Sequence, residues 1–203
     1  DEMVSSIALI LGDISQEREE FPEAISHYKW VQANVANLTP EVAEEIDFRI
    51  AACLFSQVDW APAQKAFEAF LKKYERSSVR QQVLYMNALC SFFQGKYKET
   101  KVDFDKYESE YPKGQFIPDV RYRQAIVKFG VNPPDIAGTI KLCEDWLKDF
   151  AKDRTDEVIA QTPEVYTLIG DAHIRMADEL DKKVKAADID LRVNLKTPDL
   201  SLI

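Results

Sequence analysis

A small residue, either glycine or alanine, recurs at a nearly constant interval inside an apolar, helix-like pattern. This repetition is the feature of the sequence that most strongly constrains the fold. The positions are Gly12, Ala51, Ala88, Ala125 and Gly170, separated by 39, 37, 37 and 45 residues. Glycine inside a helix costs about 1 kcal/mol relative to alanine, so its use there predicts a close approach of two helices. The stretches "LGDI" and "IGDA", which contain the two glycines, nearly repeat each other near opposite ends of the chain.

A second helical run, rich in aromatic residues, follows each of the first four small residues. In "GKYKETKVDFDKYESEYP" the bulky residues are Tyr97, Phe104, Tyr107 and Tyr111. The i+3, i+4 and i+7 spacing within such runs places the rings on one stripe of a helix. We expect Tyr97 to lie between the two helices of its own repeat and the other three rings to face inward. One helix pair cannot bury this stripe alone, whereas stacked neighbours can.

This pattern of paired helices resembles the tetratricopeptide repeat (TPR), which has a nominal period of 34 residues. The third copy carries the likeness best, through Ala88, Tyr97, Phe104 and Pro112. The resemblance implies an all-α, right-handed superhelical solenoid of antiparallel helix pairs, with about 4.5 repeats. The expected repeats span residues 5–40, 43–78, 80–114, 118–152 and 162–183. The long period and the "YP" ending are also similar to bacterial envelope TPR proteins, namely the outer-membrane assembly lipoprotein and the Tol–Pal coordinator.

Two segments depart from a regular repeat. In "GVNPPD", Pro133 and Pro134 are expected to break the helix at the turn of the fourth copy. At the C-terminus, Ile189, Leu191, Val193 and Leu195 alternate with polar residues, which predicts an extended segment. We therefore assign residues 1–183 to the solenoid and 184–203 to a capping or extended tail, which offers self-association as one role.

Composition excludes several classes of function. The 203 residues are 46% hydrophobic, which argues against a disordered chain. Their net charge is -9 and they contain no Lys/Arg-rich run, which argues against binding to nucleic acid or to anionic membrane surfaces. The apolar stretch "IALIL" near the start is too short to span a bilayer. The periplasm or cell envelope is favoured over the cytoplasm by the family resemblance only.

No arrangement of residues predicts catalysis, a metal or a cofactor. Cys53, Cys90 and Cys143 are widely spaced and lie among apolar residues, so we expect small buried side chains. His27 and His173 have no second ligand four residues away. There is no Gly-rich phosphate loop and no GxSxG motif, so we expect no enzyme.

In the TPR superfamily the first helices of the pairs line a concave groove that holds peptides. Family members that clamp a terminal carboxylate use Lys and Asn at positions that hold Asp13, Ala52, Leu89 and Ile126 here, so that mode is not expected. An apolar or aromatic peptide, with an acidic group near an arginine, fits better; alternatively, some of the rings serve only as packing residues. The groove candidates are Phe48, Arg49, Phe55, Tyr85, Met86, Leu89, Phe92, Phe93, Tyr122, Arg123, Ile126 and Phe129.

The sequence thus predicts a scaffold that binds a peptide or protein partner, of unknown identity, through an apolar and aromatic groove. The alternative is a structural spacer within a larger multi-repeat envelope protein. Asn87 occupies a position that most repeats fill with Leu or Ile. Its amide either bonds to the backbone of a neighbouring helix or marks a functional opening.

Overall fold

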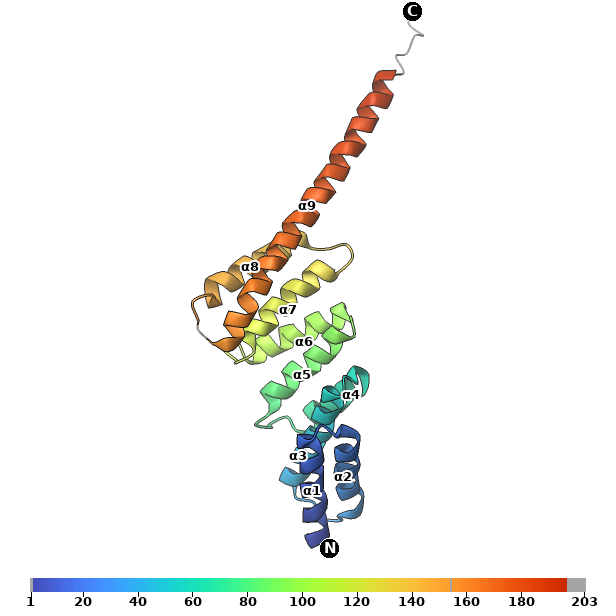
Figure 1. Ribbon diagram of the computed structural model, residues 1–203, viewed down its shortest axis with the longest axis vertical. Coiled ribbons are helices and arrows are strands. Elements are labelled where there is room, and N and C mark those ends of the chain that lie inside the picture. The colour runs from blue at the N-terminus through green and yellow to red at the C-terminus, as the bar shows by residue number, and fades with distance from the viewer. Residues whose placement is uncertain (1, 154, 197–203) are drawn as a thin grey trace, which may run out of the picture. The chain divides into compact units, whose positions relative to one another are not determined.

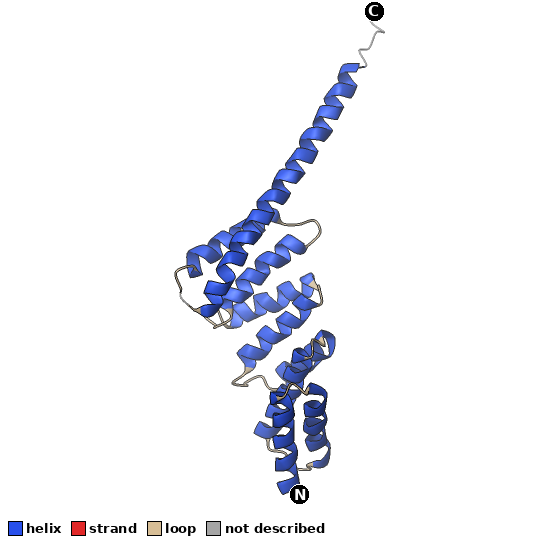
Figure 2. Ribbon diagram, in the orientation of Figure 1, coloured by secondary structure: helices blue, strands red, loops and turns tan. Residues whose placement is uncertain are grey.

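The computed structural model describes residues 2–153 and 155–196. In this part of the chain every regular element is an α-helix and none is a strand (Figure 2). The chain divides into two compact units, residues 1–120 and residues 121–203, and the boundary falls inside the seventh helix.

Unit 1 consists of antiparallel helix pairs joined by short loops (Figure 1). From α1 to α6 each helix packs on the next one along the chain, and α3 also contacts α5. The Thr39 hydroxyl accepts from the backbone N–H of Val42 and so caps the start of α3, with Pro40 as the first helical residue. The helices are α1 (Glu2–Glu17), α2 (Phe21–Asn34), α3 (Pro40–Ser56), α4 (Trp60–Lys73), α5 (Arg80–Phe93), α6 (Tyr97–Glu110) and the start of α7 (Ile117–Gly130).

The three turns inside these pairs share one backbone conformation. A residue with positive φ occupies the same place in each: Glu19 (60°), Val58 (65°) and Gly95 (70°). In each turn the following N–H donates to a carbonyl five residues back, as in Glu20 N–H to Ser15 O at 2.8 Å. This is the αL turn that ends many helices. It recurs after 39 and 37 residues, the intervals that separate the first three small residues, Gly12, Ala51 and Ala88.

Gly12 permits the close approach of α1 and α2 that the sequence predicts. A Cβ added there would lie 2.5 Å from Cε1 of Tyr28. The Tyr28 side chain cannot move aside easily, because it is fully buried and its hydroxyl bonds to Asp13 Oδ1 (2.8 Å) and Gln16 Oε1 (3.0 Å).

The aromatic stripe of the third repeat lies largely in the core of unit 1. Phe104 and Tyr107 are fully buried, as predicted. The Tyr107 hydroxyl accepts from Gln81 Nε2 (2.8 Å) and from the N–H of Phe116 (3.3 Å), so the ring links α6 to α5 and to the loop before α7. Tyr111 is half-buried at the end of α6 and contacts the Tyr107 ring.

Unit 2 contains the rest of α7 with α8 (Ile136–Phe150) and α9 (Asp156–Lys196). The break at Pro133 and Pro134 is confirmed, because α7 ends at Gly130 and α8 begins at Ile136. Asp135 caps α8 by accepting from the N–H of Gly138 at 2.9 Å. The core of this unit gathers apolar side chains from all three helices: Ala125, Cys143, Trp146, Val158, Val165 and Leu168.

The C-terminal segment differs from the prediction. α9 is 41 residues long and continues to Lys196, so the predicted extended segment from Ile189 is wrong as far as Lys196; the remaining residues, 197–203, lie outside the described part. The distal half of α9 projects past α8 (Figure 1), and residues 173–187 are all exposed. Gly170, expected to allow a close helix contact, has nothing within 4 Å of its added Cβ, so that expectation is also wrong.

Candidate functional site

The predicted groove residues at the C-terminal ends of α3 and α5 form an aromatic cluster with Trp60 of α4. Phe93 stacks on Trp60 with ring centroids 4.7 Å apart, and Phe55 packs edge-on against the same indole at 5.0 Å. Phe92 meets the Phe93 ring at 5.5 Å. We call Phe55, Trp60, Phe92 and Phe93 the aromatic cluster. Phe93 is 45% exposed, so the cluster presents a ring to the surface.

Phe48 and Arg49 lie on the same helix as Phe55 and line a hollow of about 690 Å³. The C-terminal end of α1, the N-terminal half of α3 and the loop before α5 form its walls. Phe48 and Phe55 are seven residues apart, so they lie on one side of α3 about 10 Å from each other. The sides of the hollow carry Glu41, Glu44, Glu45 and Arg76.

Arg49 is already neutralised by its neighbours. It pairs with Asp13 of α1, donates to Glu45 Oε1 (2.6 Å) and donates to the Tyr28 hydroxyl (3.2 Å). Burial disfavours its charge, but the hydrogen bonds to Tyr28 and Glu45 and the attraction to Asp13 hold its pKa above the usual value. These contacts fasten α3 to the first helix pair, and they leave little positive charge for an acidic guest.

Three further candidates on α5 are in packed positions. Tyr85 stacks on Phe116 with centroids 4.1 Å apart, and its hydroxyl donates to Asp119 Oδ2 at 2.7 Å. Leu89 is only 7% exposed and Met86 is half-buried. Sequence position alone gave no signal of these differences between neighbouring groove candidates.

The four candidates on α7 belong to unit 2. Tyr122, Ile126 and Phe129 are partly buried and pack against the apolar core of that unit, and Arg123 is half-buried. Burial, the negative charge of Glu164 and a hydrogen bond to Glu164 together raise the pKa of Tyr122 to about 12. These side chains therefore have structural contacts within unit 2.

The three cysteines are buried free thiols, as predicted. Burial raises the pKa of Cys90 to about 12 and those of Cys53 and Cys143 to about 11, so none is a ready nucleophile. Within the described residues, no group of three or more His, Cys, Asp or Glu side chains could hold a metal ion. None of the described helices combines the length and the apolar character needed to cross a bilayer.

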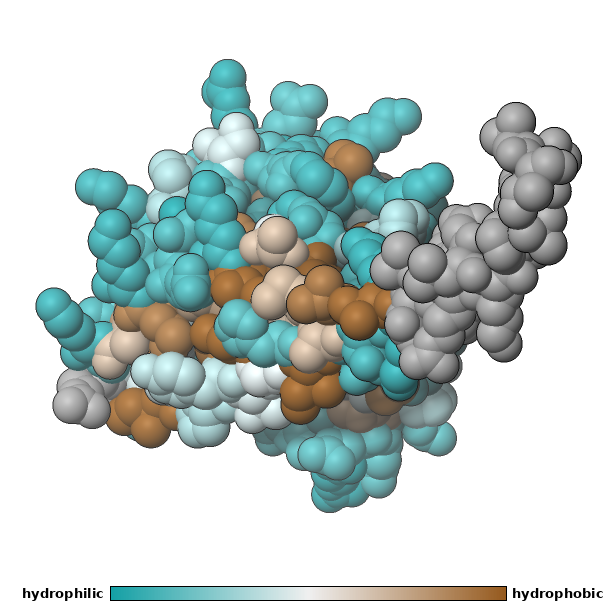
Figure 3. All heavy atoms as spheres, turned by 90° about the horizontal axis from the view of Figure 1, so that it is seen from above, coloured by the Kyte–Doolittle hydropathy of each residue, from teal (hydrophilic) through white to brown (hydrophobic). Residues whose placement is uncertain are grey.

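Apolar side chains also reach the surface outside the groove candidates. Figure 3 shows hydrophobic side chains gathered in a patch that hydrophilic side chains border. On α1 the exposed side chains are Met3, Val4, Ile7, Ile10, Leu11 and Ile14; on α9 they are Ile159, Tyr166, Ile174, Met176, Leu180 and Val184.

Comparison with known proteins shows the fold. No family model and no curated protein sequence matches the chain. Among solved structures, MamA from AMB-1 (crystal form P212121) is similar over 90% of this chain and 94% of its own, with 15% identity and a TM-score of 0.56. A Podosopora anserina protein of nearly identical TPR-like repeats, named after kinesin light chain, is similar over 92% of this chain and 95% of its own, with 14% identity and a TM-score of 0.61. The chain therefore has an all-α, TPR-like helical-repeat fold.

Proposed function

We propose that this protein is a non-catalytic scaffold that binds a peptide or protein partner through the first helices of unit 1. The observation that carries the proposal is the aromatic cluster on α3, α4 and α5, which presents Phe93 at 45% exposure. Aromatic side chains are enriched among the residues that contact protein partners, and a ring held in a cluster loses little conformational freedom when a partner binds. Phe48 and the hollow beside it extend this surface along α3.

The chemistry of the surface selects an apolar or aromatic partner segment. The hollow carries three glutamates, and its Arg49 is paired with Asp13 and Glu45. Phe48 and Phe55, about 10 Å apart, would be spanned by about three residues of an extended peptide. The guest that suits this surface is a short segment with two apolar anchors at such a spacing and without an acidic cluster.

Two finer parts of the proposal rest on the sequence resemblance. We place the scaffold in the bacterial periplasm or cell envelope, because the long repeats with "YP" endings are similar to the envelope TPR proteins. Tyr122, Arg123, Ile126 and Phe129 of unit 2 stay predicted peptide contacts by the TPR resemblance alone. Tyr122, Ile126 and Phe129 also pack against the core of their own unit.

A phage-displayed random peptide library, panned against the purified chain, tests the proposal. Enriched peptides should carry aromatic or large aliphatic residues, and Phe93→Ala should weaken their binding by about tenfold, because exposed anchor residues commonly contribute about 1–2 kcal/mol or more. Val102→Ala is the matched control, since Val102 is a 66% exposed apolar residue on α6 outside the cluster.

Equal binding by the wild type and both variants would contradict the proposal. Circular dichroism of Phe93→Ala should show unchanged helicity, because more than two fifths of this ring is already in solvent. Loss of helicity instead would mean that the ring serves the core and does not anchor a partner.

A further inference from the structure

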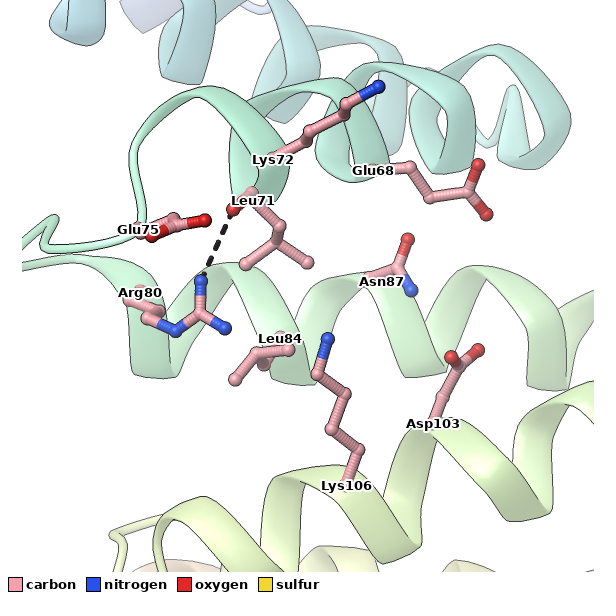
Figure 4. A pocket seen from close by; sticks show the side chains of 9 residues that line it. All are labelled: Glu68, Leu71, Lys72, Glu75, Arg80, Leu84, Asn87, Asp103 and Lys106. Carbon is pink, nitrogen blue, oxygen red and sulfur yellow. Dashed lines mark hydrogen bonds between the residues drawn. The ribbon is translucent and has the colours of Figure 1, made fainter.

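A second concave site lies in unit 1, on the side of the second helices. α4 and α6 form its walls and α5 its floor, and its volume is about 560 Å³ (Figure 4). It contains no aromatic side chain and is thus distinct from the aromatic cluster. The residues that line it are Glu68, Leu71, Lys72, Glu75, Arg80, Leu84, Asn87, Asp103 and Lys106.

Asn87, in the middle of α5, brings an unsatisfied acceptor to this pocket. The residue is 5% exposed, and its buried Oδ1 has no hydrogen-bond partner. Figure 4 shows the amide directed into the pocket, with its oxygen on the side of Glu68. A buried acceptor without a donor is destabilising. Its presence at a position where most TPR-like repeats have Leu or Ile favours a donor supplied from outside.

Two carboxylates lie on the same side of the pocket as this amide (Figure 4). Asp103 is half-buried and accepts from Ser91 Oγ at 2.9 Å. Burial raises the pKa of Asp103, and the negative charge of Glu68 raises it further. The carboxyl group of the half-buried Asp103, the buried Asn87 oxygen and the exposed Glu68 carboxylate therefore form a set of acceptors at this end of the pocket.

None of the three cations that line the pocket, Lys72, Arg80 and Lys106, bonds to the Asn87 oxygen. The ammonium group of Lys72 is directed away from Asn87 and Asp103 (Figure 4). Arg80 donates to Glu110 Oε2 (3.0 Å) and to the Leu71 carbonyl (3.3 Å), so its guanidinium is held at the other end of the pocket. Lys106 lies on α6 near Asp103 and lowers its pKa, but this effect is smaller than those of burial and of the charge of Glu68.

We propose that the pocket between α4, α5 and α6 binds a primary ammonium group through Glu68, Asn87 and Asp103. An ammonium has three N–H donors and no acceptor, which matches three acceptors that converge from three helices. Charge-assisted hydrogen bonds to carboxylates are the stronger kind. The group comes either from a lysine side chain of a protein partner or from a free polyamine.

A titration followed by NMR of the Asn87 side-chain amide tests the site. The probes are a lysine-containing tripeptide, the same tripeptide with Nε-acetyllysine, and spermidine. The lysine tripeptide and spermidine should shift the Asn87 signal in a saturable way, whereas the acetylated tripeptide should not. Tighter binding of the tripeptide assigns the lysine of a partner, and tighter binding of spermidine assigns a free polyamine. A shift that does not saturate with any amine would overturn the proposal.

A matched pair of substitutions checks the carboxylates. Glu68→Gln should weaken amine binding by about tenfold or more, because it removes a charged acceptor. Asp105→Asn removes a carboxylate from α6 that pairs with Lys101 and does not line the pocket, so affinity should change less than about twofold. Equal losses in the two variants would mean that only the general negative charge of the protein attracts the amine.

Asn87→Leu separates a ligand-binding amide from a structural one. If the amide serves a guest, the variant should melt at a higher temperature than the wild type and lose amine affinity by about tenfold. A lower melting temperature would assign the amide to the fold and overturn its role in binding. Phe93→Ala should leave amine binding unchanged, so a failure of this site and a failure of the aromatic surface can be told apart.

Discussion

The near-identical stretches around Gly12 and Gly170 have opposite environments. Gly12 is buried under the ring of Tyr28, while Gly170 is exposed with nothing within 4 Å of an added Cβ. α1 ends at Glu17, five residues after its glycine, and an αL turn at Glu19 directs α2 back across it. α9 continues for 26 residues past its glycine without a turn. A small residue therefore permits a close contact, but the turn that follows it decides whether the contact forms.

The same comparison explains the surfaces of the two helices. The part of α9 beyond Gly170 exposes Ile174, Met176, Leu180 and Val184, because no described helix follows to cover them. On α1 the side that carries Ala8, Gly12 and Ser15 is buried by its neighbours. Ala8 belongs to the apolar core that α1, α2 and α3 share. The two segments thus differ because the helices that follow α1 in sequence pack on it, whereas no described helix follows α9.

Substituting Gly12 gives the largest expected effect. Gly12→Ala places a Cβ 2.5 Å from the Tyr28 ring, which is fixed by hydrogen bonds to Asp13 and Gln16. We expect the free energy of unfolding to fall by about 2 kcal/mol, in the range for overpacked sites. Urea denaturation followed by circular dichroism measures it. An unchanged midpoint would show that α1 and α2 do not need this close approach.

The matched substitution in α9 should act in the opposite direction. Gly170→Ala meets no neighbouring atom, and alanine favours a helix by about 1 kcal/mol relative to glycine. We expect a gain of up to this size, seen in the same denaturation experiment. A loss of stability would mean that another surface covers Gly170 in solution, and the contrast with Gly12 would disappear.

Removing the Tyr28 hydroxyl should have the smallest effect. It changes how the free energy of unfolding depends on pH. Burial raises the pKa of Tyr28 to about 12, while the unfolded chain has the ordinary value of 10.0. Stability from the neutral phenol is complete below about pH 10 and is lost as the pH rises towards 12. Between about pH 8 and about pH 10.5 the wild type should therefore lose more stability than Tyr28→Phe. The check is the melting temperature of both proteins measured across this pH range. If the two melting temperatures fall by the same amount, the Tyr28 phenol is exposed to solvent and the prediction is wrong.

Several features could be predicted from local pattern because each depends on near neighbours in sequence. Phe104 and Tyr107 lie on one stripe of α6, and a stripe of rings must be buried by stacking. Cys53, Cys90 and Cys143 sit among apolar residues and are buried. Pro133 and Pro134 end α7, since neither supplies the backbone N–H that a helix requires.

The C-terminal prediction failed for a reason visible in the spacing itself. Ile189, Leu191, Val193 and Leu195 alternate with polar residues, which fits a strand. Ile189 and Val193, like Leu191 and Leu195, are also four residues apart, which fits one face of a helix equally well. The continuity with the helix before them decided the outcome, and α9 runs to Lys196.

The sequence by itself determined the helices, their pairing at a period near 37 residues and the rings that must be buried. These properties follow from local periodicity and from turn chemistry. Only the tertiary structure decided which small residues meet a partner, that Trp60 joins the groove candidates Phe55 and Phe93, and that Glu68, Asn87 and Asp103 converge on one pocket. Their convergence depends on how α4, α5 and α6 pack against one another, and packing brings together residues whose separation in sequence carries no signal of contact.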